Sequence, residues 1–111
     1  MGMVKRKEAL LISIRISFYQ GEDEAGHVYL YIMTNDLNKR PFGFIEDLFV
    51  ENWARGLGCG KKLMEELEKE AEKKDCYKIV GCFRNSKTGL IKFYKSLGYD
   101  CEYGREFRKD L

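Results

Sequence analysis

Arg55-Gly56-Leu57-Gly58-Cys59-Gly60 is the stretch that decides the fold of this chain of 111 residues. Three glycines alternate in it, between a predicted strand that ends near Val50 and a predicted helix that continues to about Lys74. Glycine lets the backbone turn freely and approach a ligand closely. The free N–H groups and the partial positive charge at a helix N-terminus attract anions. The stretch therefore predicts a binding site for a phosphate or pyrophosphate.

Two familiar phosphate-binding turns do not match this stretch. A P-loop requires Gly-Lys followed by Ser or Thr, whereas Gly60-Lys61 is followed by Lys62. A dinucleotide-binding fold requires G-x-G-x-x-G early in a βαβ unit, and the glycine spacing here is different. On the residues alone, a glycine-rich connection that merely turns the chain stays open as an alternative.

Three strands are predicted before the turn. Residues 10–18 alternate apolar side chains with serine and arginine, which is typical of a half-buried strand. Residues 27–34 are apolar on both faces, so this strand is expected to be central and to pair antiparallel with the first. A polar loop over residues 35–41 and a third strand over residues 44–50 follow, and Pro41 is expected to precede that strand.

The chain after the turn predicts two helices and further strands. The first helix is followed by a strand over residues 77–83, a second helix over residues 86–97 that stops at Gly98, and two short strands within residues 99–111. A helix that links the third and fourth strands favours a right-handed crossover and a parallel pair. The predicted fold class is α/β, with a mixed, mostly antiparallel sheet and two main helices in one domain, residues 1–111. The apolar stripe expected on the first helix consists of Leu63, Met64, Leu67 and Ala71.

Two separated motifs resemble those of the GNAT acyltransferase family. Residues 55–60 match the family signature Q/R-x-x-G-x-G/A, and Glu46-Asp47-Leu48-Phe49-Val50 precedes them. Residues 93–99, Phe-Tyr-Lys-Ser-Leu-Gly-Tyr, resemble the family element F-Y-x-x-L-G-F/Y. The resemblance runs from the first strand to the C-terminus. It implies the acyl-CoA N-acyltransferase fold and an enzyme that moves an acetyl group from acetyl-CoA to a primary amine by direct transfer.

The resemblance also implies where the cosubstrate acetyl-CoA binds. The amides of the turn would hold the CoA pyrophosphate, and the end of the preceding strand would pair with the pantetheine arm. Cys59 is interpreted as a small side chain packed behind the turn, not as a nucleophile. The residues expected to bind the cofactor are Leu48, Phe49, Val50, Arg55, Gly56, Leu57, Gly58, Cys59, Gly60, Lys61 and Asn85.

Tyr94 and Glu46 are the expected catalytic residues. Tyr94 matches the family tyrosine that protonates the departing CoA thiolate, and the alternative is a tyrosine of the core. Glu46 is the expected base that removes a proton from the amine, with Asp47 behind it. Because neighbouring strand residues point to opposite faces, only one of the two is expected to reach the site. Anchoring of arginines or loop amides is the alternative role of this acidic pair, and backbone N–H groups near Val50 are expected to face the thioester oxygen.

Two departures from the family pattern bear on the site. Where relatives carry an asparagine that contacts the pantetheine, this chain has Lys87, and Asn85 is the residue assigned to that contact. Family domains usually begin with another strand and two helices that wall the acceptor site, and little precedes the first strand here. We therefore expect a short form of the family, whose acceptor cleft is open or is completed by a second subunit in a homodimer.

The composition argues against several other classes. Twenty basic and 18 acidic residues leave a net charge of +2, so no electrostatic footprint for nucleic acid is expected. No apolar run approaches the roughly 20 residues that cross a membrane. The four cysteines lack C-x-x-C spacing and His27 is the only histidine, so no metal site is expected. Reduced thiols in a cytoplasmic protein are the expected state of the cysteines.

The sequence leaves the acceptor open. A protein lysine or N-terminal acetyltransferase is an alternative to a small-molecule acetyltransferase, because an open cleft would admit a polypeptide. A non-catalytic acyl-CoA-binding module is a third interpretation, against which the presence of Tyr94 and Glu46 weighs. Acidic groups along the cleft would favour polyamine-like acceptors.

Overall fold

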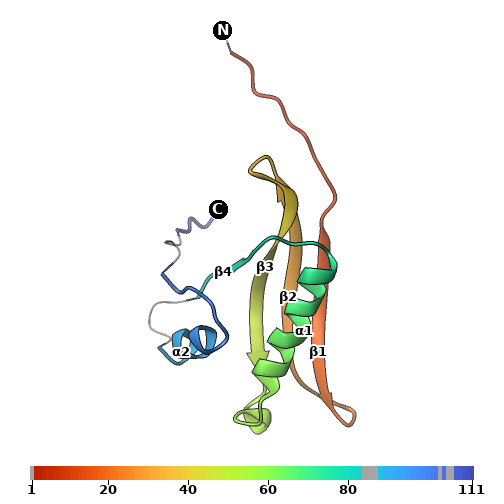
Figure 1. The fold of residues 1–111 in the computed structure, drawn as a ribbon, viewed down its shortest axis with the longest axis vertical. Coiled ribbons are helices and arrows are strands. Elements are labelled where there is room, and N and C mark those ends of the chain that lie inside the picture. The colour runs from red at the N-terminus through yellow and green to blue at the C-terminus, as the bar shows by residue number, and fades with distance from the viewer. Residues whose placement is uncertain (1, 84–87, 103, 105–106) are drawn as a thin grey trace. The chain divides into compact units, whose positions relative to one another are not determined.

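The computed structural model describes residues 2–83, 88–102, 104 and 107–111, and it divides into two compact units, Met1–Val80 and Gly81–Leu111 (Figure 1). The first unit carries most of the sheet and the longer helix, and the second carries the shorter helix. In chain order the elements are β1 Ile12–Gln20, β2 Asp23–Asn35, β3 Asn38–Val50, the 3₁₀ helix η1 Asn52–Ala54, α1 Cys59–Lys73, β4 Ile79–Gly81 and α2 Thr88–Ser96.

The sheet has the strand order β1-β2-β3-β4, with β2 antiparallel to both β1 and β3. The segment that leads into β4 follows β3 in the same direction, because Tyr77 N–H donates to Pro41 C=O and Gly43 N–H donates to Lys78 C=O, both at 2.9 Å. The predicted α/β class, with a mixed, mostly antiparallel sheet and a central second strand, is confirmed.

The polar loop predicted over residues 35–41 is wrong. β2 and β3 are longer than predicted and are joined by a turn of two residues, Asp36 and Leu37. The Asn35 side chain accepts a hydrogen bond from Leu37 N–H at 2.8 Å, which closes the turn locally. Pro41 lies inside β3, in the stretch where the register with β2 shifts, so no ladder bond needs the N–H that proline lacks.

Of the elements predicted after residue 76, the helix is found, whereas the strands are shorter or absent in the described residues. The strand predicted over residues 77–83 shrinks to β4, and the described residues of 99–111 contain no strand, with residues 103, 105 and 106 outside the description. The predicted second helix is α2, and Gly98 follows it in a left-handed conformation with φ +91°. Gly98 N–H donates to Lys95 C=O at 3.0 Å, so the predicted glycine stop is confirmed.

The core of the first unit lies between α1 and one face of β1, β2 and β3, along which α1 runs (Figure 1). Every member of the stripe predicted for this helix is buried. Burial of each large side chain contributes roughly 1.5–3 kcal/mol relative to exposure. The strand residues buried in this core include Val28, Leu30, Ile32 and Ile45.

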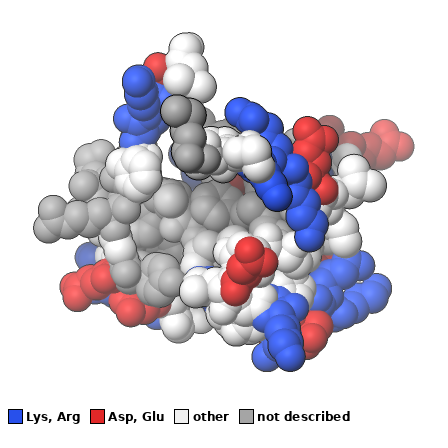
Figure 2. All heavy atoms as spheres, turned by 90° about the horizontal axis from the view of Figure 1, so that it is seen from above, with Lys and Arg blue, Asp and Glu red and all other residues white. Residues whose placement is uncertain are grey.

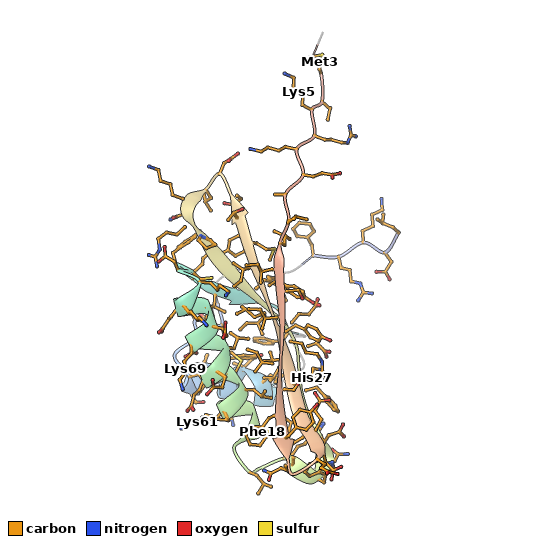
Figure 3. All side chains as sticks on the ribbon, turned by 90° about the vertical axis from the view of Figure 1, so that its right-hand side faces the viewer. Met3, Lys5, Phe18, His27, Lys61 and Lys69 are labelled. Carbon is orange, nitrogen blue, oxygen red and sulfur yellow. The ribbon has the colours of Figure 1, made fainter. Side chains whose placement is uncertain are left out.

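The opposite face of β2 carries residues of another kind. His27, Tyr29, Tyr31 and Met33 alternate with the buried positions and are only partly covered. Figure 3 shows His27 and α1 on opposite sides of the strands. Within the first unit the sheet therefore has an apolar face under α1 and a face of aromatic and polar side chains, which is called the aromatic face below.

Replacement of Gly26 by alanine is predicted to destabilise the fold. A Cβ at this position would lie 2.7 Å from the Phe49 carbonyl oxygen and 3.1 Å from Cys59 Sγ, so β3 would have to move. We expect Gly26→Ala to lower the midpoint of thermal unfolding by at least about 5 °C, as overpacking usually does. Gly89→Ala is the control, since a Cβ there meets no heavy atom within 4 Å. Equal stability of the two variants would contradict the close approach of β2 and β3.

Candidate functional site

The glycine turn connects η1 to α1. Gly56 and Gly58 have φ values of +79° and +83°, which side chains with a Cβ rarely adopt. A Cβ built on either residue would meet no heavy atom within 4 Å. Glycine is therefore required at these positions by the backbone conformation, and the space outside the turn stays open to a ligand.

The N-terminus of α1 is open to an anion. Gly58 is the N-cap residue, and neither a side-chain cap nor an acidic residue occupies the first turn. The first N–H groups of a helix have no acceptor within the helix, and they carry partial positive charge. Lys61 adds an exposed ammonium group at this end of α1 (Figure 3). The turn and the helix start thus have the chemistry that a phosphate group requires.

Arg55 fastens the turn to the strand before it. Its Nε–H donates to the Val50 carbonyl oxygen at 3.0 Å, and its backbone N–H donates to Asn52 C=O at 3.3 Å. Leu48, Phe49 and Val50 are the last three residues of β3. The structure therefore brings the end of β3, the turn and the start of α1 together within one unit, as the sequence predicts.

Cys59, the first residue of α1, is 4% exposed and packs beside Gly26 of β2. Burial raises the pKa of its thiol, which disfavours the thiolate that a nucleophile needs. The interpretation of Cys59 as a side chain packed behind the turn agrees with this placement. Among the residues that the structure describes, no group of three His, Cys, Asp or Glu side chains could hold a metal ion.

A β-bulge near the end of β3 changes the direction of the acidic pair. Tyr29 faces Glu46 and His27 faces Phe49, so Val28 alone lies opposite two residues, Asp47 and its successor. Asp47 takes up the extra residue with a left-handed φ of +57°. The expectation that Glu46 and Asp47 point to opposite faces is wrong, because this bulge turns both toward the aromatic face.

Each carboxylate has its own partner on β2. Tyr31 Oη donates to Glu46 Oε1 at 3.1 Å, and His27 Nε2 lies 2.9 Å from Asp47 Oδ2. Partial burial raises the pKa of the Tyr31 hydroxyl, and the nearby Glu46 carboxylate raises it further. Tyr31 therefore stays protonated at neutral pH and remains a donor to Glu46.

Aromatic rings surround the two carboxylates. Tyr29 and Tyr31 stack with their ring centres 6.2 Å apart, and the His27 ring lies 5.9 Å from Tyr29 and 5.8 Å from Phe49. Arg15 of β1 extends over the Tyr29 ring at 5.8 Å, but its guanidinium is engaged by Glu24 at 2.6 Å. The aromatic face thus combines two carboxylates with π surfaces, which is the chemistry that binds an ammonium group.

The second unit contains Tyr94, on α2. Its ring stacks on Phe83 at 5.8 Å and meets Phe93 and Tyr99 edge-on at 5.3 and 5.7 Å. Burial raises the pKa of the Tyr94 hydroxyl, with Cys101 as a smaller cause, so the group is protonated at neutral pH. Both expectations for Tyr94, a proton donor and a packed tyrosine, are compatible with these contacts. Asn85 and Lys87 lie outside the described residues.

Sequence reasoning missed the role of β2. It considered His27 only to exclude a metal site, and it gave Tyr29 and Tyr31 no task. The signal was present in their alternate spacing, which puts all three on one face of a strand. Their partners became visible only with the register between β2 and β3.

The surface and the helices also bear on the classes considered. On the face that Figure 2 shows, lysine and arginine side chains lie in separate groups, with acidic side chains among them. In the described part of the chain, no helix has the length and apolar character to span a membrane.

Comparison with known proteins gives several acetyltransferases. A glucosamine 6-phosphate N-acetyltransferase of Trypanosoma brucei brucei is 36% identical to this chain over 72 residues. The match covers 65% of this chain and 46% of that protein, so the chain spans about half the length of this curated relative.

Solved structures show the same fold. An acetyltransferase of Trypanosoma brucei has 27% identity and a TM-score of 0.76, over 91% of this chain and 69% of that one. Glucosamine-6-phosphate N-acetyltransferase of Arabidopsis thaliana, at 24% identity, resembles this chain in fold, with a TM-score of 0.65 over 79% of this chain and 56% of its own. The acetyltransferase (GNAT) family model matches residues 7–99, which is most of the sequence. With the glycine turn and the mixed sheet in place, this match shows that the chain belongs to the GNAT acetyltransferase family.

Proposed function

We propose that the chain is an acetyl-CoA-dependent N-acetyltransferase whose acceptor is a cationic primary amine, and that residues 1–111 work as one domain. The observation that carries this proposal is the pair of carboxylates, Glu46 and Asp47, held on the aromatic face by the strand that precedes the glycine turn. A cation-binding face and an anion-binding turn on one continuous segment suit an enzyme that brings an amine to a phosphorylated cosubstrate.

The glycine turn and the end of β3 fit acetyl-CoA. The open space at Gly56 and Gly58 and the uncapped helix start suit a pyrophosphate, and Lys61 adds a positive charge. We assign the pantetheine arm to residues 48–50 of β3, and the pyrophosphate to residues 55–61. The family contact from Asn85 stays a prediction. When bound, acetyl-CoA supplies the activated acetyl group as a thioester.

The proposed reaction starts from an acceptor that is protonated, since an alkylamine has a pKa of roughly 10. The ammonium group binds at Glu46 and Asp47, next to the aromatic rings. A base on this face then takes the proton, directly or through a water molecule, and Glu46 is the base that the sequence predicts. The neutral nitrogen then attacks the thioester carbon, and a C–N bond forms as the C–S bond breaks. Tyr94 is proposed to protonate the departing sulfur, for which its raised pKa keeps the proton available.

The aromatic face also bears on the kind of acceptor. A sugar phosphate needs a cation near the phosphate, but Arg15, the arginine beside Tyr29, is engaged by Glu24. Two carboxylates suit an amine with more than one positive charge, such as a polyamine. A lysine or an N-terminus of a protein is the alternative acceptor, because it presents the same ammonium group. A non-catalytic acyl-CoA-binding module has no use for the paired carboxylates.

Binding of acetyl-CoA is predicted to depend on the glycine turn. Titration calorimetry should show acetyl-CoA and CoA binding in the micromolar range, and Gly60→Val should weaken it at least about tenfold by blocking the approach of the pyrophosphate. Gly60 lies in the first turn of α1 without a positive φ, so this variant tests access and not backbone strain. Gly89→Ala is the matched control. A folded wild-type protein that binds neither ligand would refute the cofactor assignment.

Glu46→Gln is predicted to lower kcat/KM for a polyamine at least about tenfold, because the neutral amide does not attract the ammonium group. The assay is CoA release with spermidine, a lysine peptide and glucosamine 6-phosphate as acceptors. Glu22→Gln, in the exposed turn between β1 and β2, is the control and should act like the wild type. Preference for glucosamine 6-phosphate over both cationic acceptors would contradict the proposed substrate class.

We also propose that two copies associate through β1, the outermost strand in the sheet order. If β1 pairs antiparallel with its copy and Ile14 lies opposite Ile14, the apolar side chains of the two strands fall on the same face of the sheet. Ser13 of each chain then lies opposite Arg15 of the other. Light scattering should then show a dimer that Ser13→Lys weakens by charge repulsion and Ser13→Glu strengthens. A monomer at all concentrations, or equal effects of the two substitutions, would exclude this pairing.

A further inference from the structure

The geometry points to His27 as the group that takes the proton from the acceptor amine, with Asp47 as the residue that positions the imidazole ring. This inference rests on the proposed function and deepens it, since it assigns the proton-accepting step to a side chain that the family motifs do not include. It follows from four observations on the aromatic face, which concern the tautomer, the ring position, the neighbouring charges and the bulge.

The hydrogen bond to Asp47 determines the tautomer of His27. An ionised carboxylate only accepts hydrogen bonds, so Nε2, at 2.9 Å from Asp47 Oδ2, carries a proton. In the neutral ring the other nitrogen, Nδ1, is then unprotonated and basic. Within the part of the chain that the structure describes, Nδ1 makes no hydrogen bond. The ring therefore presents one unused basic lone pair.

The ring is held in place yet accessible. Its edge-on contact with Tyr29 and its tilted contact with Phe49 fix it between two rings, and its side chain is 18% exposed. Such an exposure lets one small group approach the ring while most of its surface is packed. This is the arrangement expected of a base that must meet a substrate in a constant orientation.

The bulge explains how Asp47 comes to face His27. In a regular strand Asp47 would point to the α1 side, and the left-handed φ of +57° brings it to the aromatic face instead. Aspartate tolerates this conformation better than most residues, but the conformation is unfavourable. Unfavourable backbone at a cluster of titratable groups is typical of functional sites. The bulge thus serves to place a carboxylate on the imidazole.

The charged groups around the ring indicate different roles for Glu46 and His27. Histidine is the side chain that most often takes a proton in catalysis, and Nδ1 of His27 has a free lone pair for it. One Glu46 oxygen is already occupied by the Tyr31 hydroxyl. The other charged groups near the ring are Glu24, whose charge Arg15 balances, and Asp47, which accepts the hydrogen bond from Nε2. Glu46 therefore holds the ammonium group, and His27 takes its proton.

The proton balance closes with the groups already named. The ammonium nitrogen gives one proton to His27 Nδ1, which later passes it to water. The nitrogen lone pair forms the C–N bond as the C–S bond breaks and its electrons leave with the sulfur. The sulfur takes the proton that Tyr94 is proposed to donate, and the second proton from nitrogen passes to solvent, from which Tyr94 is reprotonated. The net change is one amide, one thiol and one proton released.

His27 is the only histidine of the chain, so its titration can be followed as a single imidazole signal. We predict that two-dimensional ¹H–¹⁵N spectra of the ring show the Nε2–H tautomer in the wild-type protein and a mixture of tautomers in Asp47→Asn. We further predict that kcat/KM for spermidine falls on the acid side of the pH profile, with a midpoint equal to the titration midpoint of the ring. The spectra test the tautomer without any catalytic assay.

His27→Gln is the decisive variant, because its amide can still donate to Asp47 but cannot take a proton. We expect a loss of roughly 100-fold in kcat with acetyl-CoA binding unchanged, and the disappearance of the acid limb set by His27. Glu46→Gln should raise KM and keep that limb. Addition of imidazole to His27→Ala should restore part of the activity, which a merely structural histidine would not allow.

Three outcomes separate the failure of this inference from that of the proposed function. A wild-type enzyme that acetylates amines, together with a His27→Gln variant of normal kcat and normal pH profile, would overturn the role of His27 alone. An acid limb that disappears in Glu46→Gln but persists in His27→Gln would give the proton to Glu46. A wild-type protein that binds no acetyl-CoA would overturn both proposals.

Discussion

The register between β2 and β3, with its one extra residue at Asp47, is the constraint on which the rest of the structure depends. Antiparallel pairing of these strands leaves no freedom in which side chains face each other. On one side it brings the backbone of Phe49 against Gly26, where no Cβ fits. On the other side it turns two adjacent carboxylates onto the aromatic face. A shift of one residue would bury these charges under α1.

One face of the sheet forms the hydrophobic core, and the other face carries the residues of the candidate site. Under α1, aliphatic side chains are fully buried, and the described part of the chain has no buried charged residue there. The aromatic face keeps its carboxylates partly exposed, with a tyrosine hydroxyl and an imidazole as hydrogen-bond partners. Carboxylates in such a position avoid the large desolvation cost of buried charge and remain available to a cation. The same strand, β2, supplies the core residues and the site residues in alternation.

The segment that runs from the bulge to the start of α1 carries groups of opposite charge. Its first part presents carboxylates, and its last part presents free backbone N–H groups and Lys61. Arg55 ties the two together through its bond to the Val50 carbonyl. A short segment of this kind carries a negatively charged region and a positively polarised region in succession. In the proposed function, this is why an amine and a phosphorylated cosubstrate meet here.

The sequence by itself determined the features that depend on neighbouring residues along the chain. Alternating glycines before an apolar stripe of helical spacing require a tight turn and a helix start, and Gly98 after α2 requires a helix stop; both are found. The mixed α/β sheet followed from the order of these elements. Only the tertiary structure decided the rest. The hairpin at Asp36 and Leu37 extends two strands because pairing with β2 outweighs the polar composition of residues 35–41. The bulge at Asp47, and with it the meeting of His27 with a carboxylate, depends on cross-strand register, which no local pattern encodes.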